Sequence, residues 1–162
     1  MLNLLKKPLS IKTFLAELIA SGLGSGLSPI SPGTIGSIAA CIAWTILPSL
    51  SLSQEITATV LLGVFGYAAS LFAMRDAAAH ADPQWIVIDE WCGMWIALTC
   101  CPDRTVSWVA TAFVLFRFFD ISKIGPVGWA ERAPGALGVM LDDVVAGVCA
   151  GGVIGLIRIV MR

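Results

Sequence analysis

Long apolar stretches separated by short polar turns make up most of the chain. From Ser10 onward the apolar residues repeat at the three- and four-residue spacing of an amphipathic helix, at Ile11, Phe14, Leu15, Leu18 and Ile19. Ser10 is the expected N-cap of this helix. The pattern alone fits two arrangements equally: the helix lies in a membrane interface, or it packs against its own protein.

The remaining apolar residues predict about four helical units. These are residues 35–50, residues 56–74, a shorter hairpin of residues 86–101 and 106–119, and residues 144–160. At about 1.5 Å per residue, the longer runs cross most of a hydrocarbon core of about 30 Å. The last run carries Gly147, Gly151 and Gly155 on one face, a spacing that favours close packing between helices. We therefore expect an all-α, multihelical integral membrane protein that forms one domain over residues 1–162.

Composition supports a lipid environment. Hydrophobic residues make up 57% of the chain and charged residues 13%, against about 45–50% and about 25% in typical soluble proteins. The net charge is −1 and no basic run alternates with aromatic residues, so we expect no nucleic-acid partner. Membrane lipids are the expected surroundings, and the sequence leaves the oligomeric state open.

Two acidic pairs, Asp89-Glu90 and Asp142-Asp143, lie within or beside these apolar runs. A carboxylate at the centre of a membrane helix costs on the order of 2.5–3.5 kcal/mol, so the pairs require a compensating cation, water or a basic partner. Carboxylate oxygens are the ligands that Mg²⁺ prefers, and a chain whose only histidine is His80 lacks the ligands typical of zinc or di-iron sites. We predict a Mg²⁺ site formed by these four acids, and we place His80 in an exposed loop.

A third cluster combines basic and acidic residues at the end of an apolar run. Arg117, Asp120 and Lys123 recur at three-residue intervals, so they share one face if the helix continues. A guanidinium binds two phosphate oxygens at once and an ammonium adds a compact charge, which predicts a phosphate site. Internal pairing of Arg117 with Asp120 explains the pattern equally well.

A loop rich in glycine, serine and proline covers residues 21–37 and leads into an apolar helix. Its amides and the helix N-terminus offer hydrogen-bond donors to an anion, with Gly33, Thr34 and Ser37 as candidates. The same composition is typical of an ordinary turn. If the N-terminus is cytoplasmic, the turns at residues 48–55 and 102–105 face outward. The loop and all the acidic and basic clusters then share the cytoplasmic face, in agreement with the positive-inside rule.

Four motifs in order resemble the bacterial phosphatidylglycerophosphatase A family. They are GLSP at residues 26–29 with PGTIGS at 32–37, IDEWCGM at 88–94, FRFFDISK at 116–123 and GVMLDDVVAG at 138–147. The resemblance implies an all-helical, Mg²⁺-dependent enzyme of the bacterial inner membrane that hydrolyses phosphatidylglycerophosphate to phosphatidylglycerol and inorganic phosphate. It implies catalytic acids at Asp89, Glu90, Asp120, Asp142 and Asp143, with polar partners at Arg117, Lys123, Thr34 and Ser37. Ile124 and Ala136 depart from the family pattern, which usually has proline and glycine there.

The mechanism that we expect joins these groups. Mg²⁺ held by the acidic pairs bridges to the phosphomonoester, Arg117 and Lys123 bind its other oxygens, and water attacks with Asp120 or a paired acid as base. An aspartyl-phosphate intermediate is the variant that the sequence leaves open. The alternative function is an ion-coupled membrane transporter subunit, in which buried carboxylates bind a cation during transport.

Overall fold

The computed structural model describes residues 10–75 and 83–161, and His80 therefore lies outside the described residues. Within these ranges the chain contains helices and turns and no strand, so the all-α prediction is confirmed. The helices are α1 (Ile11–Ala20), the 3₁₀-helix η1 (Ser25–Leu27), α2 (Pro32–Ile46), α3 (Leu52–Ala73), α4 (Ile88–Thr99), α5 (Val106–Ser122), α6 (Pro126–Ala130) and α7 (Ala136–Val160).

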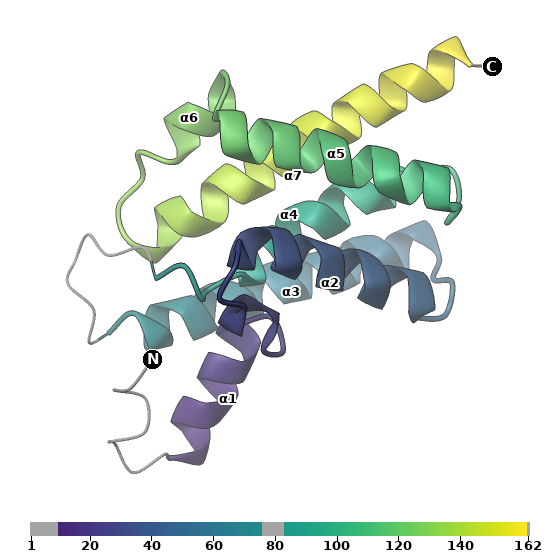
Figure 1. Ribbon diagram of the computed structural model, residues 1–162. Coiled ribbons are helices and arrows are strands. Elements are labelled where there is room, and N and C mark those ends of the chain that lie inside the picture. Colours follow the sequence, from purple (N-terminus) through teal and green to yellow (C-terminus); the bar gives the residue numbers. More distant parts are fainter. Residues whose placement is uncertain (1–9, 76–82, 162) are drawn as a thin grey trace.

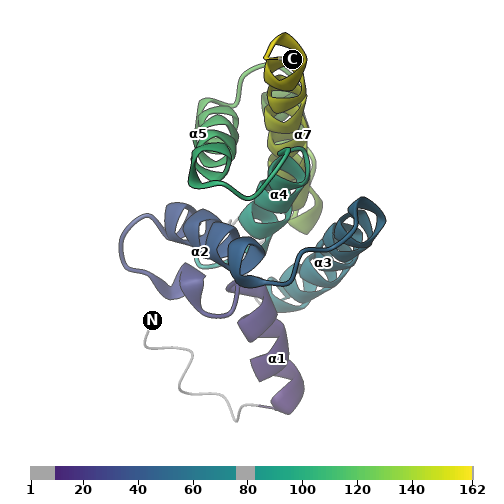
Figure 2. The ribbon, with the colours of Figure 1, turned by 90° about the vertical axis from the view of Figure 1, so that its right-hand side faces the viewer.

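Helix α4 lies at the centre of the molecule and packs against α2, α3, α5 and α7. Figure 2 shows α2 and α5 on the left of α4, α3 on its right and α7 above it. The hydrophobic core therefore surrounds α4. Its largest fully buried side chains include Met94 and Leu98 from α4, Phe116 from α5 and Ile154 from α7.

A close backbone approach in the core joins α4 to α7. A Cβ atom added to Gly147 would lie 2.3 Å from the carbonyl oxygen of Gly93, and one added to Gly93 would lie 2.3 Å from the carbonyl oxygen of Asp143. Only glycine permits the two backbones to cross at this distance. Gly93 follows the first acidic pair by one helical turn, and Gly147 follows the second by one turn. The crossing therefore brings the two acidic pairs together.

Two helices in the described part of the chain, α3 and α7, are long and apolar enough to cross a membrane, and α2 is a shorter apolar helix. The prediction of about four apolar units of spanning type is therefore not confirmed. Helix α2 ends at Ile46 because Leu47 precedes Pro48 and takes an extended conformation, with φ −67° and ψ 150°. Helix α7 begins two turns before the predicted run of residues 144–160, so Asp142 and Asp143 lie inside it.

Helix α1 confirms the predicted amphipathic helix, with Ser10 at its N-cap. It packs against α3, yet Ile11, Phe14 and Leu15 remain 74%, 50% and 50% exposed. The helix thus contacts its own protein through one face and leaves an apolar face uncovered.

The main helices run back and forth between two ends of the molecule (Figure 1). The N-termini of α2 and α4 and the C-terminus of α5 lie at one end, and the α2–α3 and α4–α5 turns lie at the other. The candidate site occupies the first of these ends.

Candidate active site

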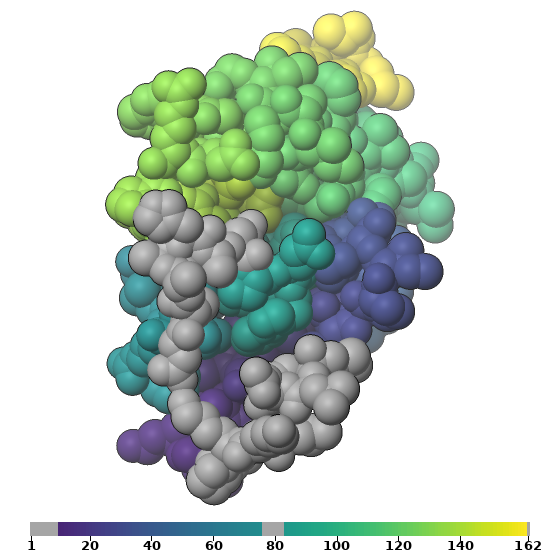
Figure 3. Space-filling view, turned by 60° about the vertical axis from the view of Figure 1, so that its left-hand side comes forward, coloured from purple at the N-terminus to yellow at the C-terminus, as the bar shows by residue number. Residues whose placement is uncertain are grey.

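A cavity of about 590 Å³ opens where α2, α4 and α5 meet. Figure 3 shows the segments that form it, in blue, teal and green, converging on one face of the molecule. Its lining combines backbone, acidic and basic groups: Pro29, Ser31, Pro32, Gly33, Thr34, Gln84, Ile86, Asp89, Glu90, Arg117, Asp120, Ile121 and Lys123. Three regions that were predicted separately from the sequence, residues 21–37, 89–90 and 117–123, thus meet around one cavity.

Three carboxylates from two helices form the acidic cluster. Asp89 and Glu90 lie in the first turn of α4, and Asp143 lies in the second turn of α7. One oxygen from each lies within 4.8 Å of the others, a separation that suits ligands of a single metal ion. Asp89 is 6% exposed and Asp143 is 3% exposed. This cluster joins acids 54 positions apart in the sequence, as the prediction of a shared site requires.

The negative charge of the acidic cluster is not fully compensated by the surrounding residues. Burial, followed by the charge of Glu90, raises the pKa of Asp89 well above its usual value, and burial also raises the pKa of Glu90. Glu90 Oε2 and Asp143 Oδ1 are buried and have no hydrogen-bond partner within the described ranges. Buried polar atoms are nearly always paired, so unpaired carboxylate oxygens indicate a place for a ligand.

Gly33 fixes the position of one of these acids. A Cβ atom at Gly33 would lie 2.2 Å from Glu90 Oε1 and 3.4 Å from Arg117 Nη1. The first turn of α2 therefore lies in direct contact with the Glu90 carboxylate. Ser31, the N-cap of α2, has a φ of 45°, and Lys123, at the end of α5, has a φ of 50°. Strained backbone of this kind often gathers at functional sites.

The basic residues of the cavity are held by two further carboxylates. Asp120 pairs with Arg117 at 2.5 Å and with Lys123 Nζ at 3.3 Å. Lys123 also donates to Asp142 Oδ2. Burial lowers the pKa of Lys123, but its hydrogen bond to Asp142 and the nearby carboxylates outweigh this effect and the net pKa is raised. The predicted pairing of Arg117 with Asp120 is therefore present. Both residues also line the cavity, so the pairing and a phosphate site are compatible.

The side chains of Asp142 and Ser37 point elsewhere than those of the other predicted site residues. Asp142 points to Lys123 rather than into the cluster of Asp89, Glu90 and Asp143. Ser37 is fully buried, and its hydroxyl donates to the carbonyl oxygen of Gly33 at 2.8 Å. Ser37 does not line the cavity, whereas Thr34 and Gly33 do.

Neither the place of Gln84 in the cavity nor that of Gly93 in the helix crossing was predicted from the sequence. Gln84 lies in the segment that leads into α4 and carries no local signal of function. Gly93 falls within the motif of residues 88–94, four positions after Asp89. That spacing indicates proximity to the acids. Gly147 was predicted to pack closely against another helix, but its pairing with Gly93 is found only in three dimensions.

Comparison with known proteins places these residues in a wider context. The family model described as phosphatidylglycerophosphatase A matches residues 18–158. The chain is 42% identical over 140 residues to phosphatidylglycerophosphatase A of Escherichia coli (strain K12), covering 85% of this chain and 80% of that protein. It is 38% identical over 136 residues to phosphatidylglycerophosphatase A of Haemophilus influenzae, covering 83% of each.

A third relative carries a different description. The putative phosphatidylinositol-3-phosphatase of Bacteroides thetaiotaomicron is 42% identical over 144 residues, covering 84% of this chain and 89% of that protein. No solved structure matches the chain significantly. These relatives are described as phosphatases and give no support to the transporter alternative.

Proposed function

Since the chain belongs to the phosphatidylglycerophosphatase A family, we propose that it hydrolyses phosphatidylglycerophosphate to phosphatidylglycerol and inorganic phosphate at the cavity between α2, α4 and α5. The observation that carries this assignment is the cluster of Asp89, Glu90 and Asp143 next to the cavity that Arg117 and Lys123 line. Phosphoryl transfer requires positive charge around the phosphate and a base for the attacking nucleophile. The cavity contains groups for both tasks.

We propose that the acidic cluster binds one Mg²⁺. The three carboxylates offer hard oxygen ligands without histidine or cysteine, and two of their oxygens are buried without a partner among the described residues. Asp142 supports the site indirectly, because its side chain is engaged by Lys123. When bound, the cation would supply charge that stabilises the phosphoryl oxygens and would acidify a nearby water.

The chain's own residues would bind and orient the phosphate. Arg117 and Lys123 line the cavity as cations, and Asp120 holds both in place through its two oxygens. The N-terminus of α2 adds the Thr34 hydroxyl and the amides of the first turn as donors. Ser37 would act through the backbone of Gly33, to which it donates.

The position of Asp120 changes the expected choice of base. Both of its oxygens are engaged by cations, so its proposed role is to position Arg117 and Lys123. The base is then drawn from Asp89 and Glu90, the two cluster carboxylates that line the cavity. We propose direct attack by water on the phosphorus. Hydrolysis of a chiral thiophosphate substrate distinguishes the mechanisms, because direct attack inverts the phosphorus centre and an aspartyl-phosphate intermediate retains its configuration.

The chain is a membrane protein by its family and its two apolar helices, and we propose that α3 and α7 span the bacterial inner membrane. The active site would then face the cytoplasm. Basic residues of the described ranges support this orientation: Lys12, Arg75, Arg117, Lys123 and Arg132 are expected on the cytoplasmic side, and Arg104 and Arg158 on the other. The lipid tails of the substrate would remain in the bilayer while its phosphate enters the cavity.

Phosphate release by the purified full chain in mixed micelles tests the proposed function. We expect turnover of phosphatidylglycerophosphate, loss of turnover in EDTA and recovery on addition of Mg²⁺. Phosphatidic acid and phosphatidylinositol 3-phosphate serve as competing phosphomonoesters, and slower turnover of both is expected. Folded protein that hydrolyses none of these lipids with Mg²⁺ would refute the proposal, and faster turnover of phosphatidylinositol 3-phosphate would reassign the substrate.

A further inference from the structure

A second cavity lies on the other side of α4 from the phosphate site. It has a volume of about 800 Å³ and runs between α3 and α7, two helices that diverge in Figure 2. We call it the α3–α7 groove. Its rims are formed by Val60 and Val64 from α3 and Val148 from α7, which are 58%, 59% and 59% exposed. The proposed catalytic mechanism uses none of these residues.

The helices that line the groove indicate that it faces lipid. They belong to the two helices that are long and apolar enough to span a membrane. If α3 and α7 cross the bilayer as proposed above, the groove opens sideways into lipid. Its volume lies within the range of about 300–1,000 Å³ that is typical of ligand pockets. The acyl chains of lipids are therefore the ligands that suit this groove.

One cation lies at the far end of this apolar groove. Arg158 lines it and donates from Nη1 to the carbonyl oxygen of Cys100 at 3.0 Å. This bond uses one of the five N–H donors of the guanidinium. Arg158 follows Asp143 by 15 residues on α7, which corresponds to about 22 Å along the helix. That length is most of a hydrocarbon core of about 30 Å.

From this arrangement we propose that the α3–α7 groove binds a membrane phospholipid, with an acyl chain along the groove and its phosphate on Arg158. The lipid would belong to the leaflet opposite the acidic cluster, so it is distinct from the substrate. An arginine at the end of an apolar groove matches a phosphate attached to an apolar chain in both charge and shape. The inference rests on the proposed membrane insertion and is independent of the catalytic mechanism.

A second copy of the chain fits the groove less well. Two copies in one membrane share an orientation, so symmetric pairing through this face would place both Arg158 side chains at the same depth. Like charges brought together in an apolar setting are unfavourable. A phosphate compensates Arg158, whereas a symmetric partner adds to its charge.

The glycines of α7 provide a matched pair of variants. A Cβ atom at Gly155 or at Gly152 meets no heavy atom within 4 Å, so either position accepts a side chain without a clash. Gly155 lines the groove and Gly152 does not. Gly155→Leu therefore places a bulky side chain inside the groove, while Gly152→Leu makes the same change on the same helix outside it. Arg158→Gln removes the charge and keeps a polar side chain.

Native mass spectrometry of the full chain, delipidated and titrated with phosphatidylethanolamine, tests the proposal. This lipid is neither substrate nor product of the proposed reaction, so binding reports on the groove. We expect the wild type and Gly152→Leu to bind one lipid per chain. Gly155→Leu and Arg158→Gln should bind about tenfold more weakly. Circular dichroism verifies folding, and Arg158→Gln decides the test if Gly155→Leu does not fold.

Equal lipid affinity in all four proteins would overturn the proposal. A wild-type dimer that Gly155→Leu converts to monomers would also overturn it, because the occupant would then be a second copy. Turnover of phosphatidylglycerophosphate is measured on the same samples. Inactive wild-type protein that still binds lipid through Arg158 would refute the proposed function and leave the groove assignment in place.

Discussion

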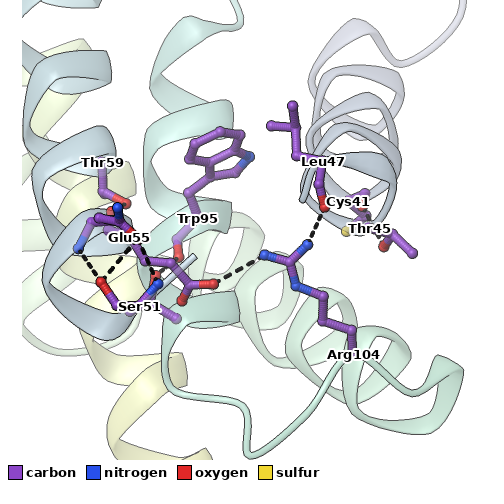
Figure 4. A network of polar contacts seen from close by, with 10 residues as sticks. Cys41, Thr45, Leu47, Ser51, Glu55, Thr59, Trp95 and Arg104 are labelled. Carbon is purple, nitrogen blue, oxygen red and sulfur yellow. Dashed lines mark hydrogen bonds and ion pairs between the residues drawn. The ribbon is translucent and has the colours of Figure 1, made fainter. Parts of the chain in front are cut away.

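Two polar clusters at opposite ends of the helices differ in charge balance. At the end away from the cavity, Arg104 pairs with Glu55 at 3.1 Å, donates to the carbonyl oxygen of Leu47 and lies 4.3 Å from the centre of the Trp44 ring. Figure 4 shows Arg104 joining the end of α2 to the start of α3. This cluster has one cation for one carboxylate. The active-site end gathers five carboxylates around two cations: Asp89, Glu90, Asp120, Asp142 and Asp143 around Arg117 and Lys123.

The difference separates a structural cluster from a binding site. The Arg104 cluster satisfies its own charges and adjoins a helix start with a complete capping box, in which Ser51 and Gln54 hydrogen-bond to each other's backbone. It therefore stabilises the fold without a ligand. The active-site cluster keeps unpaired buried oxygens on Glu90 and Asp143 within the described ranges. An excess of buried negative charge is stable only when a cation or a proton compensates it.

The largest expected effect comes from removing one acid of the cluster. Asp143→Asn should lower kcat/KM for phosphatidylglycerophosphate by about 10³-fold, because loss of metal-ion stabilisation costs several kcal/mol in the transition state. Without divalent cations the same variant should unfold at a higher temperature than the wild type, since it relieves uncompensated negative charge. Phosphate release and thermal unfolding in detergent measure the two effects.

Glu55→Gln is the matched control for this change at the opposite end. It neutralises a carboxylate of the balanced cluster, so we expect lower thermal stability and unchanged kcat/KM. If Glu55→Gln abolished activity, or if Asp143→Asn kept full activity, the functional distinction between the two ends would fail.

Loss of the guanidinium from the phosphate site should have the next largest effect. Arg117→Gln is expected to lower kcat/KM by about 10²-fold, in line with the loss of one preorganised donor to a developing charge. Arg117→Lys should recover only part of this loss, because an ammonium cannot bind two phosphate oxygens as a guanidinium does. Equal activity of Arg117→Gln and the wild type in steady-state assays would show that Arg117 does not contribute to catalysis.

A single methyl group at Gly33 tests how tightly α2 holds the acidic cluster. Gly33→Ala places a carbon 2.2 Å from Glu90 Oε1, so the carboxylate or the helix must shift. A displacement of about 1 Å costs up to about 10²-fold in rate, and we expect a loss of about 10- to 100-fold in kcat. Gly152→Ala, which meets no neighbouring atom, is the control and should keep full activity. Unchanged kcat in Gly33→Ala would show that Glu90 adjusts freely.

The smallest expected effect is on stability alone. Arg104→Gln removes a partly buried ion pair and a contact with the Trp44 ring, and we expect it to destabilise the fold by about 1–2 kcal/mol. Combining it with Glu55→Gln should destabilise the protein by less than the sum of the single changes, because both remove the same pair. Additive losses in thermal unfolding would argue against a direct interaction.

The sequence predicted the helical class and the convergence of the site because both follow from local patterns. Apolar runs predict helices, and threading them through a bilayer returns Asp89 and Asp143 to the same end. The sequence predicted that these acids share one site, but it could not predict the backbone contact that joins them, the crossing of Gly93 with Gly147, because these two residues meet only after folding.

The different settings of neighbouring residues were also beyond the sequence. Adjacent residues in a helix point about 100° apart, so Asp143 enters the acidic cluster while Asp142 faces Lys123. The two acids, which the sequence suggested would act together, therefore have different roles: Asp143 belongs to the acidic cluster and Asp142 binds Lys123. Ser37 shows the same limit, because its position on α2 turns its hydroxyl to the backbone of Gly33 instead of to the cavity.

Titration of the purified protein with Mn²⁺, a stand-in for Mg²⁺ that electron paramagnetic resonance detects, tests the central claim most directly. We expect one tightly bound ion per wild-type chain. Asp89→Asn and Asp143→Asn should each abolish tight binding, because their oxygens belong to the three-carboxylate cluster. Asp142→Asn should retain it. A wild-type chain that binds no ion, or a site that needs Asp142 and tolerates the loss of Asp143, would contradict the account.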